Sequence, residues 1–161
     1  AGTGATVGKI CGMERAMKSG LGMYAVQLGE LRMAAVVAVN ALGDIFDSST
    51  GRKIAGLRTE DGTAFSDSCE ELWKMGQREN LFTGNTTIGA VITNGKFNKA
   101  QMNKIASMTR NAYARCINPV GTMADGDSIY AASAGEVEAD LNVAGTLAAY
   151  VMERAIVAAI R

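Results

Sequence analysis

"TTIGAVITN", residues 86–94, is the clearest structural signal in this chain. Its β-branched residues form a short apolar run with turn residues after it, which is typical of a buried strand. Directly afterwards, Asn98 and Gln101 are spaced as in a capping box, and apolar residues then recur at helical spacing. The sequence therefore predicts a strand over residues 86–94 and a helix over residues 99–116.

A second strand and helix follow this pair. The run "DSIYAASAG", residues 127–135, predicts another short strand, and residues 138–160 predict a long helix with a wide apolar face. Ahead of the first pair, apolar runs at residues 22–28 and 32–40 are separated by a Gly-Glu pair, which is typical of a β-hairpin. The alternative is one buried helix, but the valines of the second run favour strands. We therefore expect helices packed on a sheet.

The connection between hairpin and central strand has a different character. Residues 43–84 are polar and rich in turn formers, with one short helix expected around residues 66–77. We predict a long exposed segment here, with a mobile loop over about residues 46–84. Such a connection is uncommon inside a compact domain, so we expect it to be functional, mobile or cleavable.

The bulk composition predicts a single globular domain. The chain has 161 residues, 48 % of them hydrophobic, and equal numbers of acidic and basic residues. Without net charge or a basic stripe, a nucleic-acid partner is not expected. No uninterrupted apolar run reaches about 18 residues and these residues show no signal-peptide pattern, so we expect no membrane partner. Cys11, Cys69 and Cys116 are widely spaced, which favours reduced thiols and a cytoplasmic location.

The chain contains no histidine, which excludes several kinds of site within it. Ser-His-Asp and Cys-His catalysis and zinc sites with histidine ligands are impossible, and we expect neither metal nor cofactor. The glycine-rich "GTGATVGK", residues 2–9, lacks the spacing of a Walker A phosphate loop. Because the chain opens in this loop without an initiator methionine, we expect it to be a processed or truncated piece.

A threonine can still act as a nucleophile without histidine. As an N-terminal residue it uses its own α-amine as the base, and such an amine has a pKa of about 7.7 to 8.0. Thr86 lies between the polar segment and the buried strand, where a cleavage after Asn85 would expose it. The alternative, the start of an ordinary strand, stays open on these residues alone.

Three further residues are candidates on chemical grounds. Asp125 and Asp127 precede a strand two positions apart, so their carboxylates would face one site, unless they belong to a solvated turn. Asn40 ends an apolar run, where a buried amide needs partners; it is either an oxyanion donor or a turn former.

Several motifs in order carry a resemblance to a known family. "AGTGATVGK", "AVNALGDI", "GNTTIGAVITN", "KAQMNKIASMTRNAYARCINPV" and "DGDSIYAASAG" resemble the self-processing L-aminopeptidase/D-Ala-esterase/amidases, which include β-aminopeptidases and endo-type 6-aminohexanoate (nylon) oligomer hydrolases. The resemblance covers the chain except about residues 46–80. It implies an α/β fold, an αββα four-layer sandwich of the N-terminal-nucleophile-hydrolase type, made as a precursor that cuts itself before a Ser or Thr.

Carried over to this chain, the resemblance places the scissile bond between Asn85 and Thr86. Residues 1–85 are then the C-terminal part of the large (α) subunit, and residues 86–161 are the small (β) subunit, with a segment upstream of both lacking. Thr86 is the implied nucleophile, and the Asn40 amide is implied to face the oxyanion.

The resemblance also implies roles for the remaining candidates. Lys9 matches a site lysine that holds developing charge or lowers the pKa of the α-amine, since one cation disfavours another nearby. Asp125 and Asp127 match the acidic pair of the nylon-oligomer branch, and other branches have serine and glutamate there. The implied substrates are small peptides, amides or esters, and the implied assembly is a homo-oligomer of αβ protomers.

Two alternatives to such a hydrolase stay open. One is an acyltransferase similar to the ornithine acetyltransferases, which also expose a threonine nucleophile; the "GNTTIGAV" context fits the hydrolases better. The other is a non-catalytic binding or assembly protein of the same fold, although Thr86 and Asn40 are both present.

Overall fold

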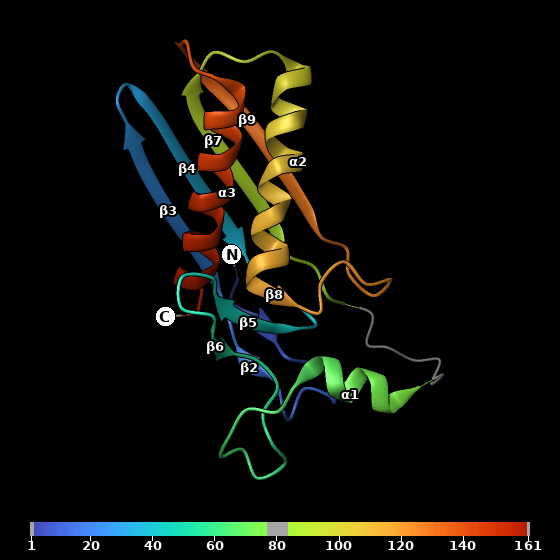
Figure 1. Cartoon of the computed structure of the whole chain (residues 1–161). Helices are drawn as coiled ribbons and strands as arrows, with labels where there is room; N and C mark the ends of the chain where they lie inside the picture. The colour runs from blue at the N-terminus through green and yellow to red at the C-terminus, as the bar shows by residue number, and fades with distance from the viewer. Residues whose placement is uncertain (1, 77–83, 161) are drawn as a thin grey trace.

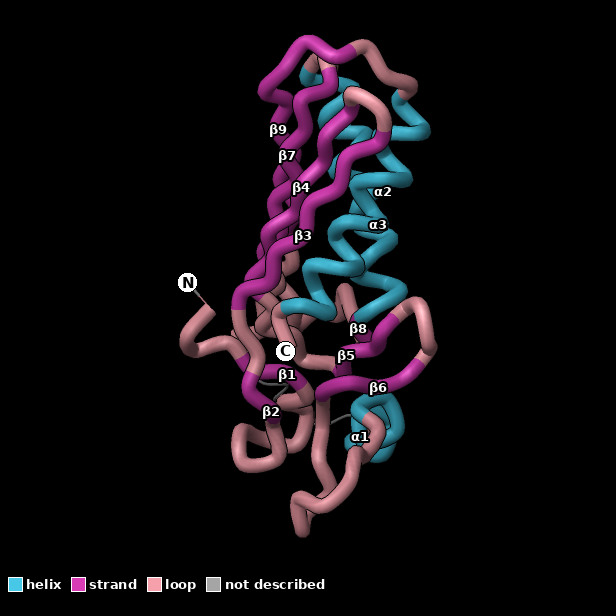
Figure 2. Tube along the Cα trace, turned by 90° about the vertical axis from the view of Figure 1, so that its left-hand side faces the viewer, coloured by secondary structure: helices cyan, strands magenta, loops and turns pink. Residues whose placement is uncertain are grey.

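The computed structural model describes residues 2–76 and 84–160, and a four-stranded sheet with two long helices dominates it. The elements are β3 Leu21–Leu28, β4 Leu31–Ala38, β7 Ile88–Gly95, β9 Ser128–Val137, α2 Lys99–Cys116 and α3 Leu141–Ala158. The strands lie in the order β3-β4-β7-β9 (Figure 1). Figure 2 shows α2 and α3 together on one face of this sheet.

The strand pairing confirms the predicted hairpin. β3 and β4 are antiparallel neighbours that meet at a Gly29-Glu30 turn, so this region is not a single buried helix. β4 and β7 are also antiparallel, whereas β7 and β9 are parallel. Parallel neighbours need a long crossover, and α2 provides it between β7 and β9.

Local capping sets where the two long helices begin. The Asn98 side chain accepts from the Gln101 N–H and the Gln101 side chain accepts from the Asn98 N–H, which confirms the predicted capping box and the helix over residues 99–116. α3 begins at Leu141, later than the predicted residue 138, because the Asp140 carboxylate caps its first turn. The predicted strand before it is confirmed as β9.

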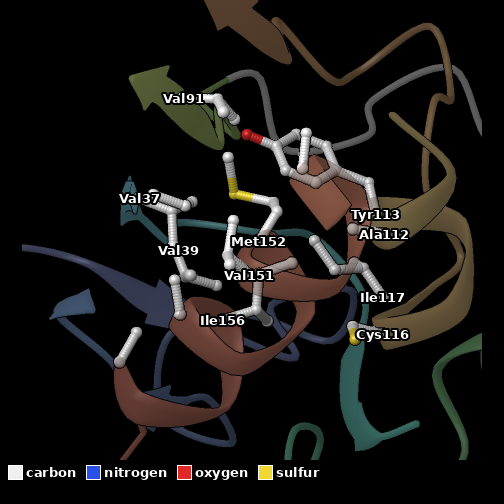
Figure 3. Packing of buried hydrophobic residues seen from close by; sticks show 14 of the residues in the cluster. Val37, Val39, Val91, Ala112, Tyr113, Cys116, Ile117, Val151, Met152 and Ile156 are labelled. Carbon is white, nitrogen blue, oxygen red and sulfur yellow. The ribbon is translucent and has the colours of Figure 1, made fainter. Parts of the chain in front are cut away.

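The core lies between the sheet and the two helices. Val37 and Val91 of the sheet, Tyr113 of α2, and Met152 and Ile156 of α3 are all at most 1 % exposed, and Figure 3 shows them converging. Full burial of such an apolar side chain stabilises the fold by roughly 1.5 to 3 kcal/mol. By length and composition alone α3 could span a membrane, but half of it is buried inside this fold, as in a core helix.

Smaller elements gather at the end of the sheet where β7 begins. A three-stranded sheet in the order β6-β5-β8 lies there, and a short helix follows β6 along the chain (Figure 1). The elements are β1 Thr6–Val7, β2 Met17–Lys18, β5 Asp44–Asp47, β6 Arg52–Ala55, β8 Ile117–Asn118 and α1 Ser68–Met75. α1 confirms the helix expected around residues 66–77.

A long exposed segment is expected over residues 43–84, but among the described residues 43–76 more than half are buried or half-buried. The buried Asp44 carboxylate organises it, accepting from Lys53 Nζ (2.6 Å), the Leu57 N–H (2.8 Å) and both the N–H and hydroxyl of Ser68 (3.0 and 2.7 Å). Because these partners are spread along the sequence, local periodicity does not predict the contacts. Of the loop predicted over about residues 46–84, residues 77–83 lie outside the described residues.

The second face of the four-stranded sheet is apolar and open. Met23, Ile92 and Tyr130 project from it with exposed fractions of 67 %, 48 % and 65 %. Two hollows of about 470 and 490 Å³ also lie on this face, lined mainly by β3 and β4. The described residues therefore supply one helix layer and one main sheet layer of the four expected.

Candidate active site

Thr86 lies just before β7, at the end of the sheet nearest the small elements. Its N–H donates to the Asn40 main-chain carbonyl (3.0 Å), which ties it to the chain leaving β4. Its hydroxyl donates to the carbonyl oxygen of Asn85 at 2.6 Å. The hydroxyl of the predicted nucleophile is thus in contact with the carbonyl group of the predicted scissile bond.

Asn40 follows β4 and is held in one orientation. Its side-chain oxygen accepts from the ammonium of Lys9 (2.8 Å) and from the Thr6 N–H (3.2 Å). These bonds turn the amide nitrogen toward the chain before Thr86, where it donates to the Gly84 carbonyl (2.9 Å). In the intact chain, this amide therefore binds the carbonyl one residue before the predicted scissile one.

Lys9 places a buried cation beside this asparagine. It comes from the glycine-rich loop, whose N–H groups at Gly8 and Lys9 donate to the carbonyls of Gly43 and Leu42 (both 3.0 Å). The residue is only 2 % exposed, and its ammonium also donates to the Asn40 main-chain carbonyl (3.2 Å). Burial lowers the pKa of Lys9 to about 8, an effect that the Asp125 charge opposes. Near neutral pH, this ammonium is therefore unusually ready to lose its proton.

The two candidate carboxylates bind different groups. Asp125 accepts from the N–H and the hydroxyl of Thr122 (2.9 and 2.8 Å), which is the turn role left open by the sequence. Asp127 instead accepts from the N–H of Thr87 (2.7 Å), next to the predicted nucleophile. Burial, and secondarily the Asp125 charge, raises the pKa of Asp127. Asp127 thus holds the main chain at Thr87, just before β7, and Asp125 places a negative charge near Lys9 and Asp127.

Sequence reasoning missed two groups that touch this region. The N–H of Gly126 donates to the Asn85 carbonyl (2.9 Å), and a Cβ at Gly126 would lie 2.8 Å from the Thr86 hydroxyl oxygen. The buried hydroxyl of Tyr113 lies 3.4 Å from the Thr87 carbonyl oxygen. The Asp-Gly-Asp sequence was a signal for the glycine, whereas a tyrosine in a helix carried none.

A polar cavity opens on the helix side of Asp127. Its volume is about 260 Å³ and its lining includes Arg110, Tyr113 and Ser128. In residues 2–76 and 84–160, no three His, Cys, Asp or Glu side chains are grouped as a metal ion would need. The chemistry available here is that of a hydroxyl, a buried amine, amides and carboxylates.

Comparison with known proteins assigns the chain to a family. The profile of peptidase family S58 matches residues 1–161. This chain belongs to peptidase family S58. The S58 chain is 32 % identical over 138 residues to an uncharacterized aminopeptidase of Mycobacterium leprae, covering 84 % of this chain and 37 % of that protein. It is 30 % identical over 145 residues to a 6-aminohexanoate-oligomer endohydrolase of Kocuria sp., covering 86 % and 39 %.

Solved structures agree on the fold. The S58 chain matches the L-aminopeptidase D-Ala-esterase/amidase of Ochrobactrum anthropi, described as a variant of the Ntn hydrolase fold, with a TM-score of 0.60 at 18 % identity, covering 98 % of this chain and 42 % of that one. A Burkholderia β-aminopeptidase matches with a TM-score of 0.58 at 16 % identity, covering 98 % and 44 %. These likenesses confirm the predicted fold type. The S58 chain spans about two fifths of the length of these proteins.

Proposed function

We propose that Thr86 cuts the Asn85–Thr86 bond and then, as an N-terminal residue, hydrolyses small amides. The contact of the Thr86 hydroxyl with the Asn85 carbonyl oxygen, at 2.6 Å, is the observation that carries the proposal. Thr86 Oγ attacks the Asn85 carbonyl carbon, the bond to the Thr86 nitrogen breaks, and the hydroxyl proton ends on that nitrogen. Water then hydrolyses the resulting ester. Residues 1–85 and 86–161 become the two subunits.

In the cleaved protein, the free α-amine of Thr86 replaces the missing histidine as the base. It takes the hydroxyl proton as Oγ attacks a substrate carbonyl and returns it to the leaving amine, after which water releases the acyl group. The Lys9 charge near this site lowers the pKa of the amine and so keeps more of it unprotonated near neutral pH. The Asn40 amide stabilises the oxyanion, a contribution of roughly a hundredfold to a thousandfold in turnover.

The relatives support an amide hydrolase. Two of the similar proteins are named as an aminopeptidase and an oligomer endohydrolase, both of which break amide bonds. We propose small peptides, amino-acid amides or esters as substrates. In the four-layer sandwich, a second sheet would cover the apolar face that carries Met23, Ile92 and Tyr130. Assembly into a homo-oligomer of αβ protomers and a cytoplasmic location are further proposals.

Two variants at one position test the self-cleavage. Denaturing mass spectrometry of the full-length protein is expected to find a fragment that begins at Thr86. Thr86→Ala should abolish both this fragment and amide hydrolysis, whereas Thr86→Ser keeps a hydroxyl and should retain both in reduced measure. Active wild-type protein that consists of unbroken chains would refute the proposal.

A substrate panel tests the second half of the proposal. L-, D- and β-aminoacyl amides should release ammonia with the cleaved protein and not with Thr86→Ala. Faster transfer of the acyl group to an added amine such as ornithine than to water would instead identify an acyltransferase.

A further inference from the structure

The parallel pairing of β7 with β9 continues past the ends of both strands. Ile88 pairs with Ser128, and Asn85 forms an isolated parallel bridge with Asp125 in the same register. In such a ladder, the N–H that follows one partner donates to the carbonyl of the other. In this register Thr87 lies opposite Asp127, and the next N–H, that of Ser128, donates to the Thr87 carbonyl (3.1 Å). In the same way, the N–H of Gly126, which follows Asp125, donates to the Asn85 carbonyl (2.9 Å). The ladder thus aims a backbone donor at the scissile carbonyl.

The side chain expected to do this is engaged elsewhere in the intact chain. The Asn40 amide nitrogen donates to the Gly84 carbonyl at 2.9 Å, and its oxygen is held by Lys9 at 2.8 Å. Swinging the amide onto the Asn85 carbonyl would break both bonds. The two donors therefore serve different carbonyls before cleavage: Gly126 that of Asn85, and Asn40 that of Gly84.

Glycine at position 126 also makes room for the nucleophile. Its backbone lies outside the left-handed region, so conformational freedom does not explain it. A Cβ would lie 2.8 Å from the Thr86 Oγ, which is too close for the hydroxyl to keep its place, and 3.8 Å from the Asn85 carbonyl oxygen, which is an ordinary contact. The same residue thus supplies a donor to the carbonyl and space for the attacking oxygen.

We infer that the Gly126 N–H is the oxyanion donor of self-cleavage, and that the Asn40 amide holds residue 84 until the cleaved segment leaves. This inference rests on the proposed cleavage after Asn85. When Thr86 Oγ bonds to the Asn85 carbonyl carbon, negative charge collects on the carbonyl oxygen that Gly126 already contacts. The carbon–nitrogen bond then breaks, the hydroxyl proton ends on the Thr86 nitrogen, and the charge returns to a carbonyl. Departure of residue 84 frees Asn40 for the carbonyl of a substrate.

A backbone substitution tests this donor directly. In the full-length protein, incorporation of glycolic acid at position 126 replaces the N–H by an ester oxygen and adds no side-chain atom. The matched control is the corresponding ester at Ser128, which removes the next donor of the same ladder. The ester at 126 is expected to slow formation of the Thr86 fragment by roughly a hundredfold to a thousandfold, as loss of one oxyanion donor does elsewhere. The ester at 128 should slow it by less than tenfold.

If the two esters slow formation of the Thr86 fragment equally, the effect belongs to the ladder as a whole and the inference is overturned. The inference is also overturned if the protein with the ester at 126 forms this fragment at the wild-type rate. The Asn40→Ala variant tests the division of roles without an ester substitution. It should lower amide turnover by the cleaved enzyme more than it lowers the self-cleavage rate, and the reverse order overturns the division of roles. If unmodified protein yields no Thr86 fragment, the proposed function fails as well. If it does and the ester at 126 cleaves as fast, only this inference fails.

Discussion

We expect the protein to become more stable between pH 8 and pH 10, and replacement of the buried Lys9 by methionine should remove this gain. Lys9 is 2 % exposed, and burial lowers its pKa from 10.5 to about 8. Below pH 8 both folded and unfolded states hold the proton, and the folded state carries the cost of a buried charge. Above pH 8 only the unfolded state keeps the proton, so the free energy of unfolding rises with pH until about 10.5.

The size of this effect follows from the two pKa values. At 1.36 kcal/mol for each pH unit, the difference between 10.5 and about 8 corresponds to about 3 kcal/mol. Between pH 7 and pH 10, most of this, about 2 to 3 kcal/mol, should appear. Lys9→Met keeps a chain of similar length in the same place but has no proton to lose. The stability of wild type relative to Lys9→Met should therefore increase by that amount.

Urea titrations at pH 7, 8, 9 and 10 measure this difference. Both proteins carry Thr86→Ala, so that the chains stay uncleaved, and contributions from groups other than Lys9 cancel in the subtraction. Lys96→Met is the control, because a hydrogen bond with Glu136 raises the pKa of this exposed lysine. Stability from a raised pKa is lost only above 10.5, so the control should show no gain in the window. Parallel stability profiles for wild type and Lys9→Met would refute the reasoning.

Three further predictions concern packing and buried polar groups. A Cβ at Gly22 would lie 1.9 Å from an α3 carbonyl oxygen, so Gly22→Ala should lower the free energy of unfolding, measured by urea titration, by about 1 to 3 kcal/mol. A Cβ at Gly4 would have nothing within 4 Å, so the control Gly4→Ala should change this free energy by less than about 0.5 kcal/mol. The Thr87 hydroxyl is buried without a hydrogen-bond partner among the described residues, so Thr87→Val should raise the melting temperature. Thr109→Val, which loses a 2.8 Å bond to a helix carbonyl, should lower it, and a shared sign would contradict this account. Asp44→Asn removes the carboxylate from a 2.6 Å ion pair and should cost about 3 kcal/mol, so a loss below about 1 kcal/mol in urea titration would contradict its organising role.

The long elements were predictable because their signals are local. The capping box at Asn98, the apolar period of α2 and the Gly-Glu turn of the hairpin each lie within one element, and the structure confirms all three. The small sheet of β5, β6 and β8 was not predictable. Its order depends on the Asp44 carboxylate, which binds groups up to 24 positions away. A polar residue that is buried among distant donors looks, in the sequence, like any residue of an exposed loop.

The candidate site, too, was predictable only in part. The lack of histidine and the ordered motifs pointed to Thr86, Asn40 and Lys9, and the structure places all three within a chain of hydrogen bonds. Side-chain orientation was beyond the sequence: Asp125 caps its own turn through Thr122 instead of sharing a target with Asp127. Alternation along an extended chain fails there because the turn ends just before the strand begins.

Within these 161 residues, the sequence by itself determined which side chains are available, because the lack of histidine excludes histidine catalysis within the chain and makes the Thr86 hydroxyl the nucleophile that we propose. Only the tertiary structure decided which groups meet that hydroxyl and its carbonyl. Every residue but proline carries a backbone N–H, so strand register alone selects Gly126 as the donor to Asn85. Likewise, a lysine has the same intrinsic basicity everywhere in a sequence, and the low pKa of Lys9 exists because neighbours from distant segments remove water from it.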